Sequence, residues 1–326
     1  MKTVANVAIH ASQFPESVRR DLLASLRTRQ VNHKFHYDSV KQTQKWLALH
    51  QIYSPSRNDA DCAATYDRAF CEAAEEIKAK RVHVMGLGCG GGQKDTRLLK
   101  LLKVGGREVF YTPGDVSTAM VLVARAAAMA VVPEKNCFPL VCDLASAPDL
   151  PAVFDSCPAP RAPRLVTFFG MIPNFEPRKI LPKLASLVRP KDFLLFTANL
   201  APGENYPGGV KKILPQYDNP PTRDWLLTFL LDLGVQRGDG ELRFAIEPGG
   251  LGLKRVVALF HFTRARRVEI ESETFPFRRG ESIRLFFSYR YTPALARKAL
   301  ASHGLKVLAQ WITQSEEEGV FLCRRK

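Results

Sequence analysis

Val82-His83-Val84-Met85-Gly86-Leu87-Gly88-Cys89-Gly90-Gly91-Gly92-Gln93-Lys94 is the stretch that decides the fold of this 326-residue chain. Its apolar start predicts a buried strand over residues 81–87, and a helix is expected over residues 94–102. The glycines between them let the backbone turn tightly and come close to a ligand. The stretch therefore predicts a strand–turn–helix unit whose turn can hold a ligand.

The glycines in this turn fit two patterns. Gly86-x-Gly88-x-x-Gly91 fits the fingerprint of dinucleotide-binding proteins, whereas Gly88-x-Gly90-x-Gly92 fits the S-adenosylmethionine (SAM) loop of methyltransferases. Glycine spacing alone is weak evidence, because some such turns bind nothing. The rest of the chain favours the methyltransferase pattern, since carboxylates end the next two expected strands and a hairpin ends the chain.

Outward from the turn, strands and helices alternate. Further strands are expected at residues 108–111, 137–141, 165–169 and 193–198, with helices from residue 117 and at 178–187. Near the C-terminus we expect a helix at 292–302, then strands at 306–312 and 319–324. This order predicts an α/β fold: a parallel, doubly wound, Rossmann-like class I methyltransferase sheet with an antiparallel C-terminal hairpin.

Two regions interrupt this pattern and predict a second, α+β lobe that binds the substrate. Residues 201–290 open with prolines and glycines, and a helix near 225–233 and strands at 254–263, 267–273 and 282–291 are expected there. Residues 1–60 contain an amphipathic helix at 16–30 and an extended segment at 53–57, before a helix at 61–80. We therefore predict a SAM-binding domain of residues 61–200 and 291–326 and a substrate-binding lobe of residues 1–60 and 201–290.

Candidate cofactor ligands follow the expected strands. Asp115 ends the second strand, where a carboxylate can accept hydrogen bonds from ribose hydroxyls. Asp143, followed by Leu144, ends the third, where it can accept from an adenine amino group. Lys94 lies just inside the first helix and can pair with the methionine carboxylate. SAM is therefore the expected cofactor, bound by Gly88, Gly90, Lys94, Asp115, Asp143 and Leu144.

With these residues in place, the chain resembles the histidine-specific, SAM-dependent Nα-methyltransferases of ergothioneine biosynthesis. The matching pieces span nearly the whole chain, and their order and spacing together are fairly specific. They are Phe35-His36-Tyr37-Asp38, Tyr53-Ser54-Pro55-Ser56-Arg57, the glycine turn with Thr96-Arg97-Leu98-Leu99, Asp115-Val116-Ser117, Cys142-Asp143, Phe169-Gly170 through Asn174-Phe175, Gln216-Tyr217-Asp218-Asn219, and Ile283-Arg284 through Ser288 and Pro293.

The resemblance implies a Rossmann-like domain with a second lobe, and it implies substrate roles for five residues. Tyr37, Tyr53, Asn174 and Tyr217 fall on positions that hold the amino and carboxylate groups of the amino acid, and Ser288 falls where the family contacts an imidazole. Methyl transfer from a sulfonium needs a neutral nitrogen aligned behind the methyl carbon, so positioning carries much of the catalysis. We expect Tyr37, Asn174 and Tyr217 to orient the amine, with Tyr37 a candidate to assist its deprotonation.

The chain departs from the family at three places. The acidic residue that often opens the glycine motif is Gly86, and the loop at 170–174 is one residue shorter. The family has a carboxylate two residues before Ser288 that accepts a hydrogen bond from the histidine ring, but Phe286 stands there. An imidazole N–H left without its acceptor would cost ~1–3 kcal/mol. Phe286 therefore suggests a substrate with a more apolar or aromatic side chain.

Taken together, these features predict an N-methyltransferase that acts on the α-amino group of an amino acid or related amine. Two alternatives stay open: a methyltransferase for RNA or another anionic substrate, and a SAM-binding protein without catalysis. The chain carries 47 Lys and Arg against 32 Asp and Glu, a net charge of +15, which raises nucleic acid or an anionic membrane as partners. Because the excess is spread along the sequence, we expect neither a nucleic acid nor a membrane as partner. We also expect the protein to be a monomer.

The cysteines and histidines predict no metal. The seven cysteines form no Cys-x-x-Cys pair, which disfavours a disulfide framework or a zinc site and fits a reducing cytoplasm. His33 and His36 have a spacing seen in metal sites, but no acidic or thiol group accompanies them. The N-terminus shows no basic segment followed by an apolar run, so we expect a cytoplasmic protein without a signal peptide.

Overall fold

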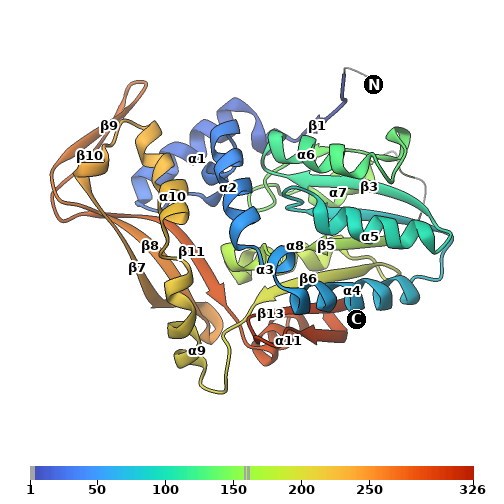
Figure 1. The fold of residues 1–326 in the computed structure, drawn as a ribbon. Coiled ribbons are helices and arrows are strands. Elements are labelled where there is room, and N and C mark those ends of the chain that lie inside the picture. Colours follow the sequence, from blue (N-terminus) through green and yellow to red (C-terminus); the bar gives the residue numbers. More distant parts are fainter. Residues whose placement is uncertain (1–3, 158, 160–161) are drawn as a thin grey trace.

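The computed structural model describes residues 4–157, 159 and 162–326, and its centre is an eight-stranded sheet (Figure 1). The strand order is β1-β4-β3-β2-β5-β6-β13-β12, with β13 antiparallel to both of its neighbours. This order confirms the predicted Rossmann-like methyltransferase sheet with a C-terminal hairpin. The strands are β1 (Ala8–Ile9), β2 (Arg81–Leu87), β3 (Glu108–Asp115), β4 (Leu140–Val141), β5 (Arg164–Phe168), β6 (Phe193–Asn199), β12 (Leu305–Ile312) and β13 (Glu318–Arg325).

Helices cover both faces of this sheet, because its central strands are apolar on both sides. On one face α4 (Ala60–Glu76) and α5 (Gln93–Val104) pack their buried residues, such as Phe70 and Leu98, against the sheet. On the other, Phe154, Leu181 and Leu300 come from α7 (Leu150–Asp155), α8 (Pro177–Leu187) and α11 (Pro293–Ala301). The helix α6 (Thr118–Ala128) follows β3 and begins at its cap Ser117, as expected.

A second sheet, with strand order β11-β8-β7, organises the material of residues 201–290. Its strands are β7 (Gly240–Pro248), β8 (Lys254–Phe262) and β11 (Ser282–Arg290), and a hairpin of β9 (Arg266–Ile270) and β10 (Glu273–Phe277) lies beside it. Its core also contains Leu26, Phe35 and Trp225. These come from both sequence regions assigned to the substrate-binding lobe, which lie side by side in Figure 1. The helices here are α1 (Pro15–Thr28), α2 (Val40–Tyr53), α3 (Pro55–Asn58), α9 (Tyr206–Ile213) and α10 (Pro220–Asp232).

Several local expectations were wrong. Residues 53–57 are not extended: α2 runs to Tyr53, with its N-terminus capped by Ser39, and Pro55 begins α3. The strand expected at 137–141 is only Leu140–Val141. The elements that were not expected are α2, α3, α7, α9, β1, β7 and β10. The strand β1 pairs with β4 at the edge of the large sheet, although residues 1–60 were assigned wholly to the other lobe.

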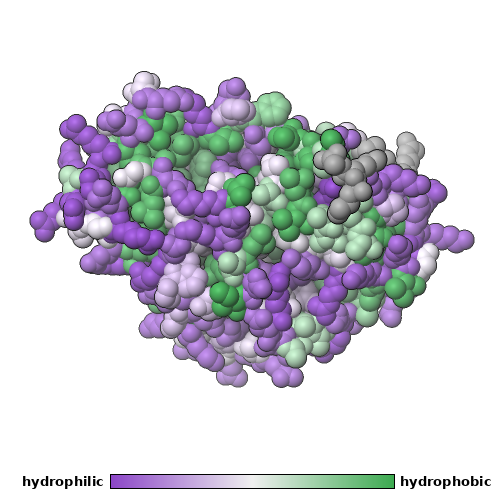
Figure 2. All heavy atoms as spheres, turned by 45° about the horizontal axis from the view of Figure 1, so that its top comes forward, coloured by the Kyte–Doolittle hydropathy of each residue, from purple (hydrophilic) through white to green (hydrophobic). Residues whose placement is uncertain are grey.

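The surface mixes polar and apolar groups. Figure 2 shows one face of the molecule, where hydrophilic side chains surround a broken band of hydrophobic ones. Among the described residues, no helix has the length and apolar character needed to cross a membrane.

Candidate active site

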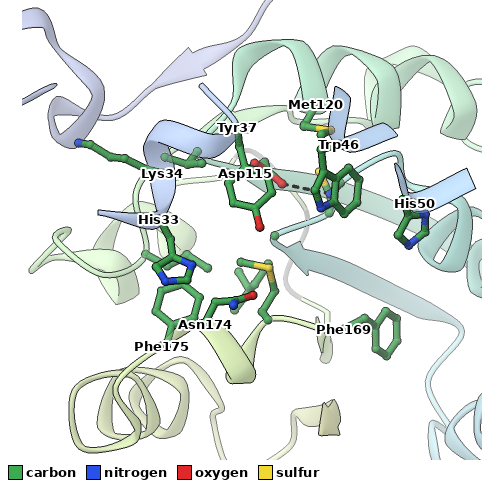
Figure 3. A pocket seen from close by; sticks show the side chains of 18 of the residues that line it. His33, Lys34, Tyr37, Trp46, His50, Asp115, Met120, Phe169, Asn174 and Phe175 are labelled. Carbon is green, nitrogen blue, oxygen red and sulfur yellow. Dashed lines mark hydrogen bonds between the residues drawn. The ribbon is translucent and has the colours of Figure 1, made fainter. Parts of the chain in front are cut away.

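A cavity of about 690 Å³ lies where the glycine turn of the large sheet faces the second lobe. Its walls come from the turn, the ends of β3 and β4, the 3-10 helices His33–His36 and Ile172–Asn174, helix α2, and strand β11. Figure 3 shows side chains from both lobes converging on it. Of the predicted site residues, nine line this cavity: Tyr37, Tyr53, Gly88, Gly90, Lys94, Asp115, Asp143, Leu144 and Asn174.

The backbone of the turn distinguishes the two glycine patterns. Gly88, Gly90 and Gly92 have φ angles of 67°, 50° and 72°, which side chains with a Cβ rarely adopt. Gly86 and Gly91 are not in this left-handed region. A Cβ on Gly92 would lie 2.7 Å from the backbone of helix α6, so the third glycine also permits close helix packing. The positions whose backbone favours glycine therefore follow the methyltransferase spacing.

The two predicted acidic residues stand at neighbouring strand ends. Asp115 accepts hydrogen bonds from the backbone N–H of Gly90 at 3.0 Å and of Ser117 at 3.1 Å. Burial raises the pKa of its carboxyl group. Asp143 accepts from the N–H of Ala145 at 2.8 Å and from the hydroxyl of Ser146 at 2.9 Å. Carboxylates at these two ends, beside a glycine turn that begins a helix, fit the ribose and adenine groups of SAM.

Gly86 stands where the family often has an acidic residue, and a carboxylate from another element occupies the space beside it. Asp95, on the first turn of α5, lies directly above Gly86, where an added Cβ would be 2.2 Å from its carboxylate oxygen Oδ2. Asp95 accepts hydrogen bonds from the hydroxyls of Tyr111 and Thr167, both at 2.8 Å, and it lines the cavity. Burial raises the pKa of Asp95 to about 6. Sequence analysis missed this residue, because its place depends on the space left by Gly86.

Lys94 has partners within the protein. Its ammonium donates to the hydroxyl of Tyr66 at 2.7 Å, and it lies 3.8 Å from the carboxylate of Glu318. Glu318 in turn accepts a hydrogen bond from Tyr66. The cluster stands at the cavity wall, where a ligand carboxylate would compete with Glu318 for Lys94. The predicted pairing of Lys94 with the methionine carboxylate stays a prediction.

Tyr37 and Asn174 face one another across the middle of the cavity (Figure 3). The Tyr37 ring packs 5.5 Å from the ring of Trp225 and 6.0 Å from that of Trp46, and its hydroxyl has no hydrogen-bond partner among the described residues. Burial, and then the charge of Asp115, raise the pKa of Tyr37. Both effects favour the neutral phenol over the phenolate.

A hydrogen bond to the backbone determines which way the Asn174 amide is turned. Its Nδ2 donates to the backbone carbonyl of Phe287 at 2.7 Å. The opposite orientation would set two oxygen acceptors against each other. Its Oδ1 is therefore left as an acceptor in the cavity. Tyr53 also lines the cavity, but from the end of α2, where its side chain is half exposed.

Three predicted residues are not among those that line the cavity. The hydroxyls of Tyr217 and Ser288 lie 2.7 Å apart, and Arg290 donates to the Tyr217 hydroxyl at 2.7 Å. The Phe286 ring packs 6.0 Å from the rings of Tyr217 and Trp225. Together they form a filled cluster on one face of β11. Substrate contacts of Tyr217, Phe286 and Ser288 stay predictions.

The other face of β11 brings residues that sequence analysis did not select. Phe287 and Arg284 line the cavity, together with His33 from the N-terminal region. The ring of His33 lies 4.5 Å from that of Phe287. Sequence alternation could have separated Phe286 from Phe287, but a β-bulge between Arg284 and Phe286 hides which of them faces the cavity.

Comparisons with known proteins agree with this geometry. A family model described as histidine-specific methyltransferase, SAM-dependent, matches residues 18–206 and 252–325, which is most of the chain. No curated protein sequence matches the chain.

Solved structures with a similar fold include three bacterial methyltransferases. Magnesium protoporphyrin IX methyltransferase from Synechocystis PCC 6803, with bound SAH, is 12% identical over 90% of this chain and 98% of that chain, with a TM-score of 0.48. The CcbJ methyltransferase from Streptomyces caelestis is 14% identical over 80% and 88%, with a TM-score of 0.40. The amino pentose methyltransferase CalS10 from Micromonospora echinaspora is 14% identical over 80% and 92%, with a TM-score of 0.37.

Proposed function

Because this chain belongs to the family of histidine-specific, SAM-dependent methyltransferases, we propose that it methylates the α-amino nitrogen of an amino acid or related amine. The family match confirms the predicted cofactor, SAM, and the transferase class. When bound, SAM supplies an electrophilic methyl group. Gly88, Gly90, Asp115, Asp143 and Leu144 are the residues we assign to holding it, because they line the cavity at the glycine turn and the strand ends.

The observation that carries this proposal is the oriented amide of Asn174. An attacking nitrogen must be uncharged, and an amine still carries N–H groups that need acceptors. The Oδ1 atom of Asn174 offers one acceptor, and the Tyr37 hydroxyl opposite offers a second. Both groups are neutral, so they orient an amine without forcing it to stay protonated. An oxygen or carbon nucleophile would not need two acceptors.

The cavity also supports the proposal of an apolar or aromatic substrate side chain. Phe286, from which the sequence predicts such a side chain, does not line the cavity. Phe287, Phe175 and Met171 do line it and support the same proposal. Apolar and aromatic walls favour a side chain that leaves few polar groups unpaired.

The proposal is tested by incubating the protein with SAM and each of the twenty amino acids and common biogenic amines, with mass spectrometry as readout. We expect a gain of one, two or three methyl groups on at least one α-amine. Amino acids whose α-amine is acetylated provide the matched control and should gain none. Methylation that persists on the acetylated substrates, or no gain on any α-amine, would reject the proposal. Methylation of histidine alone would reject only the apolar side chain.

A further inference from the structure

Strand β11 ties two cavity side chains to one residue. The backbone N–H of Phe287 donates to Nε2 of His33 at 3.3 Å, and its carbonyl accepts from Nδ2 of Asn174 at 2.7 Å. In an antiparallel strand, the N–H and C=O of one residue point to the same side. His33 and Asn174 are therefore held next to each other on the wall of the cavity, as Figure 3 also shows.

The contact with Phe287 determines which ring nitrogen of His33 carries the proton. A neutral imidazole has one donor and one acceptor nitrogen, so a ring that accepts through Nε2 carries its proton on Nδ1. This Nδ1 is buried and has no hydrogen-bond partner among the described residues. Burial, and then the neighbouring His36 and Arg284, lower the pKa of His33 well below its usual value, which keeps the ring neutral. A buried N–H donor without an acceptor is costly unless a ligand supplies one.

Arg284 brings an unpaired cation to the same wall. Its guanidinium lies 5.2 Å from the centre of the Phe287 ring and donates to Oε1 of Gln30 at 2.6 Å. Among the described residues, it is the half-buried cation of the cavity that has no carboxylate within ion-pair distance. Burial, and then the charge of Arg255, lower its pKa, and the charges of Glu247 and Glu176 act in the opposite direction.

The neighbouring arginine makes the contrast clear. Arg255 lies equally close to the Phe287 ring, at 5.2 Å, but it pairs with Glu176 at 2.9 Å and with Glu247 at 3.2 Å. The local carboxylates are thus bound to Arg255. Arg284, which faces the cavity, is left for a ligand.

We propose that the α-carboxylate of the substrate binds between the Arg284 guanidinium and the Nδ1–H of His33, while its amine faces Oδ1 of Asn174. The proposal rests on the proposed function, since it assumes an α-amine as methyl acceptor. In an α-amino acid, the amine and the carboxylate are attached to the same carbon, which matches two side chains anchored on one residue. The Tyr217 hydroxyl, already bonded to Ser288 and Arg290, is not needed for this carboxylate. The substrate is therefore an amino acid, and not its decarboxylated amine.

Binding and turnover measurements together test the proposed carboxylate site. Amino acids, their α-carboxamides and their decarboxylated amines, such as tryptophan, tryptophanamide and tryptamine, are titrated into the protein loaded with S-adenosylhomocysteine. The same sets are then assayed for methyl transfer from SAM. We expect the carboxylate form to bind about tenfold or more tightly than the amide, because a charge-assisted pair is lost. Equal binding of acid and amide would overturn the inference without any variant.

Variants locate the effect. Arg284→Gln and His33→Leu should each reduce the preference for acid over amide, whereas His33→Gln, which keeps an acceptor and a donor, should retain more of it. Arg279→Gln, an exposed charge on another turn, is the control. S-adenosylhomocysteine affinity shows that each variant is folded. A preference that survives both Arg284→Gln and His33→Leu overturns the assignment.

The two proposals fail separately. Selective binding of the acid without methylation of any α-amine would reject the proposed function and keep the carboxylate site. Methylation of acid, amide and amine alike would keep the proposed function and reject the carboxylate site.

Discussion

At the scale of single residues, Asn174 provides the sharpest test of the site. Replacement by Ala removes Oδ1 and the bond to the Phe287 carbonyl, while the glycine turn and the strand ends stay intact. We expect kcat/KM for the amine substrate to fall by about tenfold to a hundredfold, and SAM affinity to change less than about twofold. Steady-state kinetics and calorimetric titration measure the two. Asn205→Ala, which removes a cap on α9, is the control. Equal losses of substrate and cofactor affinity would contradict the role.

Asp95 leads to a prediction about pH. Its folded pKa is about 6 and its unfolded value is near 3.8, so the unfolded chain loses this proton first as pH rises. Its contribution to stability is therefore fully present below about pH 4 and is lost as pH rises through about 6, a change of about 3 kcal/mol. Asp95→Asn removes this titration. The free energy of unfolding of the variant, relative to the wild type, should rise by that amount between these two pH values.

Denaturant unfolding at several pH values checks the Asp95 prediction. A difference between variant and wild type that does not change with pH would contradict it. Gly86→Ala provides a second measurement, because its Cβ would lie 2.2 Å from the carboxylate of Asp95 and should destabilise the fold at every pH.

The site residues that the sequence predicted are those that stand in recognisable local motifs. Gly88, Gly90 and Asp115 could be found, because the turn and the strand ends are contiguous in the chain. His33, Arg284 and Asp95 could not, because their roles depend on tertiary contacts between segments far apart in sequence. A histidine at position 33 does not by itself indicate a binding residue. Its hydrogen bond to Phe287 joins residues 254 positions apart in the sequence.

At the scale of elements, helix α2 connects the second lobe to the cofactor turn. The Thr43 hydroxyl on α2 donates to the carbonyl of Tyr37 and lies 3.0 Å from the hydroxyl of Ser117. Ser117 in turn donates its backbone N–H to Asp115. One hydroxyl therefore links Tyr37 to the carboxylate expected to hold ribose.

We expect Thr43→Val to weaken SAM binding by about threefold to tenfold, because one buried hydrogen bond between the lobes is lost without a change of side-chain shape. Thr65→Val, at a buried threonine on α4, is the control. Cofactor titration gives the affinity, and proteolysis reports whether α2 becomes more accessible. Unchanged SAM affinity in Thr43→Val would show that α2 is not coupled to the turn.

The elements that could be predicted are those with apolar periodicity. The strand β2 and the C-terminal hairpin were found because their residues are buried in a regular pattern. The strand β7 was missed because most of its side chains are partly or fully exposed. Helix α9 was missed because Pro207, Gly208 and Gly209 predict a turn. The short strand β1 depends wholly on its pairing with β4.

At the scale of the whole molecule, the net charge of +15 belongs mainly to the surface. Several surface arginines are paired with carboxylates. Arg266 and Arg264 lie 2.5 and 3.7 Å from the buried carboxylate of Asp239, and Arg27 on α1 pairs with Glu273 on β10. Paired charges release few counterions, so they contribute little to nucleic-acid binding. Arg284, unpaired in the cavity, is better placed to attract an anionic small molecule.

This distribution predicts how the protein responds to RNA. Any association should be non-specific and should fall steeply as salt rises to about 0.15 M. It should leave amino-acid methylation unchanged, because basic surface groups such as Arg264 and Arg266 do not line the cavity. Filter binding across a salt series measures the association. Transfer of labelled methyl groups from SAM, scored separately in RNA and in amino acids, measures the activity. Label in RNA that persists at this salt would favour the alternative of a nucleic-acid substrate. Label confined to the amino acid would assign the positive surface to solubility and the reaction to the cavity.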